Sequence, residues 1–246
     1  MCASYARAEC RLYPLAMPDA ADLIAAVIAG DPTRVAEIVA ADPGLAEARD
    51  GAGVSALLLA RYRHDRPVLD ALLAADPEMD IFDAAALGHL DRLRDRLEQG
   101  PGRVTAFSAD GFTALHLAAF FGKSEAVRTL LDAGAPVDIR GRNTLANRPL
   151  HAAAAGRNVE ACRMLLAAGA EVDVAEHGGL TPLHLAAQEG DVEMTELFLS
   201  AGADPSVRAD DGRTPIDLAE AAGHADLAVR LRAVASDRGG TGTATA

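Results

Sequence analysis

The most regular part of this sequence spans residues 179–206 and reads GLTPLHLAAQEGDVEMTELFLSAGADPS. Thr181 and Pro182 place a side-chain acceptor before a proline, which favours a helix start because proline lacks the N–H that the first helical position leaves unpaired. Gly190 ends this short helix and Gly202 ends a second one, since glycine readily takes the left-handed conformation that follows helices. The polar segment ADPSVRADDG (203–212), which begins in this stretch and continues beyond it, has turn-forming composition. The stretch therefore predicts two short helices and a loop.

The same pattern recurs along the chain, and its period can be measured. Three further stretches align with it: GFTALHLAAFFGKSEAVRTLLDAGAPVD from Gly111, RPLHAAAAGRNVEACRMLLAAGAEVD from Arg148, and GRTPIDLAEAAGHADLAVRLRAV from Gly212. The apolar residue before the histidine position is spaced by 35, 33 and 33 residues in Leu115, Leu150, Leu183 and Ile216. A weaker form of the pattern continues upstream, at Leu23, Leu57 and Ile81. Self-similarity at such a period is the sign of a repeat architecture.

These residues resemble the ankyrin repeat family over roughly residues 19–234, strongly in the last four units and less so in the first three. The resemblance implies an all-α solenoid of about seven helix-turn-helix units with finger loops along one edge. We expect units near residues 19–50, 51–76, 77–109, 110–143, 144–177, 178–210 and 211–234. Residues 1–18 would form an N-terminal extension, and the Gly- and Thr-rich residues 235–246 a disordered tail.

Stacking explains the composition, and three departures from the repeat predict irregularities. Alanine supplies nearly half of the apolar residues, which suits helices that approach closely, and each unit needs its neighbours to bury its apolar face. Leu57 and Ile81 are only 24 residues apart, which predicts a direct helix-to-helix connection without a finger, and a bend. The connection IRGRNTLANR (139–148) is two residues longer, which predicts a less regular finger. Arg157 occupies a turn-glycine position, and we expect that turn to be shifted.

Composition argues against several classes of function. The formal net charge of −13 disfavours a surface that neutralises phosphates, so we expect no nucleic-acid partner. No run of eighteen apolar residues exists, and the N-terminus lacks the apolar core of a secretion signal, so we expect no membrane-spanning segment and no signal peptide. Cys2, Cys10 and Cys162 form no disulfide framework, which favours a cytoplasmic protein. The excess of arginine over lysine suggests a bacterial source.

No arrangement of side chains predicts catalysis, a metal or a cofactor. His116, His151 and His184 recur with the repeat, but equivalent helices lie roughly 8–10 Å apart, too far for one zinc ion at about 2.0–2.1 Å from each nitrogen. The resemblance implies instead that each imidazole makes hydrogen bonds within and between units. Ser55 lies at a helix-cap position, and no nucleophile elbow or phosphate-binding glycine loop occurs. We expect Cys162 to be a small core residue.

The candidate functional residues therefore lie on the surface. The resemblance implies that residues just before the turn glycine or the helix cap line a concave face, and large side chains there are those that interfaces favour. The candidates for partner binding are Tyr62, Arg63, Leu87, Phe112, Phe120, Phe121, Leu180, Gln188, Glu189 and Arg213. The first six are expected to form an apolar patch edged by arginine. An alternative is that Phe120 and Phe121 pack against neighbouring units or against the shortened connection.

The favoured function is a non-catalytic protein–protein interaction scaffold, an adaptor or inhibitor that binds an unidentified partner protein as a monomer. Two other interpretations stay open at this point. One is an enzyme or small-ligand receptor that uses the concave groove, which would need a deep pocket with converging polar groups. The other is a secreted effector that mimics a host ankyrin module.

Overall fold

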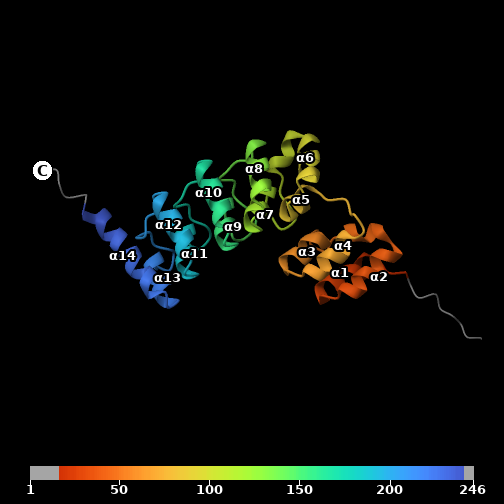
Figure 1. Ribbon diagram of the computed structural model, residues 1–246, viewed down its shortest axis with the longest axis horizontal. Helices are drawn as coiled ribbons and strands as arrows, with labels where there is room; N and C mark the ends of the chain where they lie inside the picture. Colours follow the sequence, from red (N-terminus) through yellow and green to blue (C-terminus); the bar gives the residue numbers. More distant parts are fainter. Residues whose placement is uncertain (1–16, 241–246) are drawn as a thin grey trace, which may run out of the picture.

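Fourteen α-helices form seven consecutive pairs in the computed structural model, which describes residues 17–240 (Figure 1). The first helix of each pair lies on the inner side of the solenoid: α1 (Ala20–Ala29), α3 (Ala56–Tyr62), α5 (Ile81–Leu87), α7 (Ala114–Phe120), α9 (Pro149–Ala155), α11 (Pro182–Gln188) and α13 (Pro215–Ala221). The second helices lie on the outer side: α2 (Pro32–Ala41), α4 (Arg66–Leu73), α6 (Leu90–Glu98), α8 (Ser124–Asp132), α10 (Val159–Ala167), α12 (Val192–Ser200) and α14 (Ala225–Gly240). Two short 3₁₀ segments follow α2 and α6: Pro43–Glu47 and Pro101–Thr105. The predicted all-α repeat solenoid is confirmed.

The inner helices begin where the sequence pattern places them. The Thr113 hydroxyl accepts the His116 N–H, and the Thr113 N–H donates to the imidazole Nδ1 of the same histidine, so the two residues cap the helix reciprocally. Ser55 plays the cap role in α3, where its hydroxyl accepts the Leu58 N–H. Each unit therefore starts its inner helix with a local hydrogen-bonded cap.

Small side chains allow the inner helices to stack. The alanine pairs 118–119, 153–154 and 186–187 are at most 3% exposed in every residue, and α7 packs extensively on both α5 and α9. Larger apolar residues, such as Leu115, Leu150 and Leu183, are fully buried in the core that runs between the helix layers. The free thiol of Cys162 lies in the same core, as expected, and burial raises its pKa to about 12. The core is thus continuous along the stack and has no single centre.

The stack is disturbed between the second and third units, where residues 74–80 link α4 to α5 without a finger, as the short spacing predicts. The inner helices α3 and α5 remain in contact there. In contrast, α4 and α6 hardly touch each other, although α2 packs closely on α4 and α6 packs on α8. Figure 1 shows α1–α4 set at an angle to the rest of the solenoid. The missing finger therefore opens the outer side of the solenoid at this junction.

Two details differ from the sequence predictions. The last helix, α14, continues to Gly240, so residues 235–240 are helical rather than a disordered tail. Arg238 fixes this extension because its guanidinium donates to the Gly202 and Ala203 carbonyl oxygens. The turn at Arg157 is not shifted: Arg157 itself takes the left-handed conformation, with φ of 56°, that glycine takes at most equivalent turns.

Other expectations fall outside what the structure describes. Most of the predicted N-terminal extension, with Cys2 and Cys10, precedes residue 17, and residues 241–246 follow the described part. Within residues 17–240, no helix is both long enough and apolar enough to cross a bilayer.

Candidate functional site

Aromatic side chains gather where α3 and α7 end. The rings of Tyr62 and Phe121 lie 5.5 Å apart between centroids, and those of Phe120 and Phe121 lie 5.0 Å apart at nearly a right angle. The Tyr62 hydroxyl donates to Asp110 at 2.6 Å, which fixes its ring across the gap between two units. Burial, together with this hydrogen bond, raises the pKa of Tyr62, so the phenol stays neutral. The edge-to-face arrangement is one that aromatic pairs prefer.

Beside this cluster lies a cavity of about 240 Å³, which we call the aromatic pocket. The residues that line it are Tyr62, Phe112, His116, Leu117, Phe120, Leu145, Asn147, Ala152 and Ala155. They come from α3, α7, α9 and the two flanking fingers, and nearly all present hydrocarbon. Leu145 is half exposed at the rim, whereas Asn147 is buried. The side-chain oxygen of Asn147 is buried near Gly141 and has no hydrogen-bond partner among the described residues.

The structure separates the six residues of the predicted apolar patch. Tyr62, Phe112 and Phe120 meet in the aromatic pocket. Phe121 does not belong to an exposed patch: it is only 8% exposed and packs with Leu58, Ala86 and Leu117 between three units. The prediction placed it outward because it assumed regular stacking, whereas the bend creates a space that this ring fills.

The other two members lie away from the pocket. Arg63 caps the end of α3 and is exposed, and Leu87 lines a different cavity at the bend.

The remaining four candidates lie further along the solenoid. Gln188 and Glu189 are exposed at the end of α11, where Glu189 is 4.0 Å from the guanidinium of Arg157. Leu180 and Arg213 occupy finger tips, and each offers its backbone carbonyl to a histidine of the preceding unit. These four residues do not contribute to the aromatic pocket.

Sequence reasoning missed the part of the pocket that comes from the irregular finger. Leu145 and Asn147 lie in the connection with two additional residues, and its extra length brings Leu145 over the pocket rim. The finger is held in place because the Leu145 carbonyl accepts the His177 N–H at 3.0 Å. The insertion itself was the available signal, since insertions in repeats map to loops that commonly carry function.

The repeated histidines are structural, as expected from the resemblance. The Nε2 atoms of His116, His151 and His184 lie 3.1–3.2 Å from the carbonyl oxygens of Asn147, Leu180 and Arg213. Because a carbonyl can only accept, each ring carries its proton on Nε2. Burial lowers the pKa of both His116 and His151 to about 4, so these rings are neutral at pH 7. The described residues contain no cluster of metal-ligating side chains.

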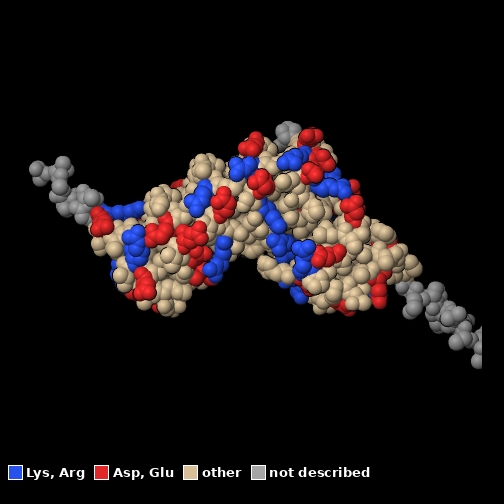
Figure 2. Space-filling view, in the orientation of Figure 1, with Lys and Arg blue, Asp and Glu red and all other residues tan. Residues whose placement is uncertain are grey.

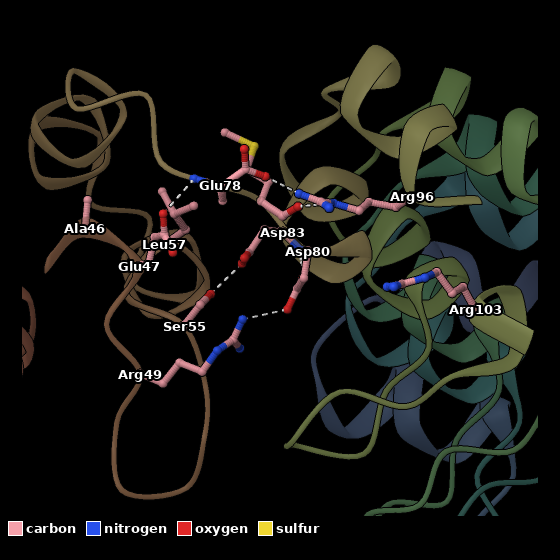
Figure 3. Close-up of a pocket in the computed structure, with 11 residues that line it drawn as sticks. Ala46, Glu47, Arg49, Ser55, Leu57, Glu78, Asp80, Asp83, Arg96 and Arg103 are labelled. Atoms are coloured by element: carbon pink, nitrogen blue, oxygen red, sulfur yellow. Dashed lines mark hydrogen bonds and ion pairs between the residues drawn. The ribbon is translucent and has the colours of Figure 1, made fainter. Parts of the chain in front are cut away.

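A polar seam crosses the bend on the finger side of the solenoid (Figure 3). The buried carboxylate of Asp83 accepts the Ser55 hydroxyl, which belongs to the preceding unit. Arg49 also reaches across and donates to Asp80 at 2.8 Å. Burial and the neighbouring charge of Asp80 raise the pKa of Asp83 to about 7.

Asp83 lies three residues after Asp80, the cap of α5, as His116 lies three residues after Thr113, the cap of α7, and the seam links units that lack a finger. It lines a cavity of about 260 Å³ with Arg96 and Glu78, which also form an ion pair. The Ser55 hydroxyl donates to Asp83 and the Arg49 guanidinium donates to Asp80, so both polar contacts cross from one unit to the next. The seam therefore works as a junction between units.

Comparisons with known proteins agree with this geometry. The sequence profile of the family described as ankyrin repeats (3 copies) matches residues 23–176 and residues 150–236. The chain is also 40% identical over 67 residues to the human protein named DNA-binding protein RFXANK. That match covers 27% of this chain and 26% of the relative, so the similarity concerns about a quarter of each protein.

Proposed function

The chain belongs to the ankyrin repeat family, whose members generally mediate protein–protein interaction, and we propose that it is a non-catalytic scaffold that binds a partner protein in the aromatic pocket. The scaffold would act as an adaptor or an inhibitor. The observation that carries the proposal is that Tyr62, Phe112 and Phe120 line an open apolar cavity on the inner side of the solenoid.

The dimensions and chemistry of the pocket suit a peptide segment. A cavity of about 240 Å³ accepts one or two apolar side chains, and rigid aromatic walls lose little conformational freedom on binding.

We also propose that the protein is a cytoplasmic monomer. The free, buried thiol of Cys162 is consistent with a reducing compartment.

Selection from a displayed peptide library tests the proposal with the full-length chain. Peptides enriched on the wild type would be measured by fluorescence anisotropy against Phe120→Ala and Leu145→Ala, which remove opposite parts of the pocket wall. We expect affinity to fall about tenfold or more in each, since truncating a central aromatic anchor commonly removes that much binding energy. Gln188→Ala, on the same side of the solenoid but outside the pocket, should bind as the wild type does.

Two results would contradict the proposal. One is that the enriched peptides bind Phe120→Ala and Leu145→Ala with wild-type affinity. The other is that Gln188→Ala loses as much affinity as the pocket variants, which would move the binding surface to the end of α11. Urea unfolding of each variant, followed by circular dichroism, shows that a loss of binding is not a loss of folding.

A further inference from the structure

The bend creates a second cavity, on the outer side of the solenoid, with an unusual charge. Where α4 and α6 hardly touch, a space of about 390 Å³ lies between α3, α4, the end of α5 and the turn that precedes α8. We call it the basic cavity, and it is lined by Ala60, Arg61, His64, Asp65, Arg66, Leu69, Leu73, Leu87, His89 and Lys123. Figure 2 shows basic side chains gathered between α3 and α7, where the two parts of the solenoid meet. Leucines form part of its wall, and cations and histidines occupy much of the remainder.

The two central cations of this cavity have no acidic partner among the described residues. Arg61 lies with its guanidinium 4.5 Å from the centre of the Phe121 ring and makes no ion pair. Lys123, the only lysine of the chain, extends from the turn between α7 and α8 along Gly88 and also makes none. Most of the other described arginines form ion pairs, so these two cations differ from the majority.

The other charged residues of the cavity do not neutralise these two. Arg66 is paired with Asp70 on its own helix, at 2.7 Å. Asp65 is the one acid in the lining, and its carboxylate caps α4 by accepting the Val68 N–H. The cavity therefore keeps an excess of positive charge inside a protein with a net charge of −13.

Holding these cations together is unfavourable in the empty cavity. Burial, together with repulsion from Arg61 and Arg66, lowers the pKa of Lys123. Burial and repulsion from Arg66 likewise lower the pKa of Arg61. This arrangement does not stabilise the folded chain. An anion bound in the cavity would offset both the repulsion between the cations and the cost of their desolvation.

We propose that the basic cavity binds the phosphate group of a phosphomonoester between Arg61 and Lys123. A dianionic phosphate neutralises two cations at once, whereas a carboxylate neutralises one. The guanidinium offers a planar fork of donors and the ammonium a compact charge, and both bind phosphate well. The group could come from a small phosphorylated molecule or from a phosphorylated side chain of a protein. The proposal is independent of the aromatic pocket, because the two cavities share no lining residue.

The single lysine makes a direct test possible. Protein labelled with ¹³C only in lysine gives one side-chain spin system, that of Lys123, whose shifts would be followed by NMR at about pH 8, where a phosphomonoester is a dianion. The probes are inorganic phosphate and a blocked phosphoserine, N-acetyl-O-phosphoserine N-methylamide. Acetate and sodium chloride at matched ionic strength are the reference anions. We expect saturable shifts with both phosphate probes, at least about tenfold tighter than with acetate.

Two variants test whether the Lys123 shifts arise from phosphate bound in the basic cavity. Arg61→Gln should weaken phosphate binding about tenfold or more, because a charged hydrogen bond is lost. Arg128→Gln on α8, an exposed arginine outside the cavity, should leave it unchanged. Tighter binding of the phosphoserine probe than of inorganic phosphate would indicate a phosphorylated protein as the source, and the reverse order a small molecule.

The inference is overturned if the Lys123 shifts depend on ionic strength alone or if acetate binds as tightly as phosphate. It is equally overturned if Arg61→Gln, still folded by circular dichroism, binds phosphate as the wild type does.

Discussion

Replacing Asp83 with asparagine tests the role of the polar seam at the bend. In the folded protein the pKa of this carboxyl is raised from 3.8 to about 7, chiefly by burial. Between these values the folded chain keeps the proton that the unfolded chain releases, so the stability contributed by Asp83 is complete below pH about 4 and is lost as the pH rises toward 7. An asparagine stays neutral throughout and can still bond to Ser55, so the variant should not suffer this loss.

The expected magnitude follows from the two pKa values of Asp83. One pKa unit corresponds to about 1.4 kcal/mol, so going from pH about 5 to about 8 should lower the wild-type free energy of unfolding by about 2–3 kcal/mol through this group alone. The buried histidines act in the opposite direction over part of the range. The quantity to measure is therefore the difference between Asp83→Asn and wild type, in which the histidine contributions cancel.

Urea unfolding followed by circular dichroism at several pH values measures this difference. From pH about 5 to about 8, the free energy of unfolding of Asp83→Asn should increase by about 2–3 kcal/mol relative to that of the wild type. Asp217→Asn is the matched control, because Asp217 occupies the same repeat position in α13 but its hydrogen bonds to Thr214 lower its pKa. Its difference from wild type should stay constant between pH about 5 and 8. Parallel pH profiles for Asp83→Asn and wild type would refute the reasoning.

Three further changes test the packing of the repeats by the same urea assay. Ala186→Leu should reduce stability by about 1–3 kcal/mol, because Ala186 is only 1% exposed between stacked helices, and an unchanged midpoint would contradict this. Gly156→Ala should be destabilising by a similar amount, about 1–3 kcal/mol, since its Cβ would lie 2.0 Å from the Phe120 carbonyl oxygen; wild-type stability would show that this contact is absent. Burial lowers the pKa of His116 from 6.5 to about 4, so the stability it contributes is complete above pH about 6.5 and is lost as the pH falls toward 4. His116→Gln should show a smaller loss over that range, and an equal loss would argue against a neutral buried ring.

The regular part of the fold could be predicted because its signals are local. Thr181-Pro182 and the glycines that follow determine the helix ends of one unit. The repeat period then predicts equivalent helix ends in the other units. The missing finger between Leu57 and Ile81 was also visible, since it changes only a spacing. These features depend only on residues close together in the sequence, so they can be predicted without knowing how the units are arranged in space.

The site was predicted less completely because it depends on the angle between units. Phe121 appeared to face outward under regular stacking, but the bend turns it into a core residue. Arg61 and Lys123 lie two units apart in the sequence, and the placement of the units around the bend brings them to one cavity. The extension of α14 was not predicted because the residues after Val234 are mostly small or polar. The contacts by which Arg238 anchors them are visible only in the structure.

The weak contact between α4 and α6 has a consequence for how the molecule loses its structure. In a linear array, stability is a sum over units and over the interfaces between nearest neighbours. Cooperative unfolding is then interrupted first at the weakest interface. We therefore expect α1–α4 and the remaining helices to unfold as two blocks, each with its own free energy of opening. Amide hydrogen exchange along the backbone should therefore change in one step at residues 74–80, with neighbouring amides within each block exchanging together.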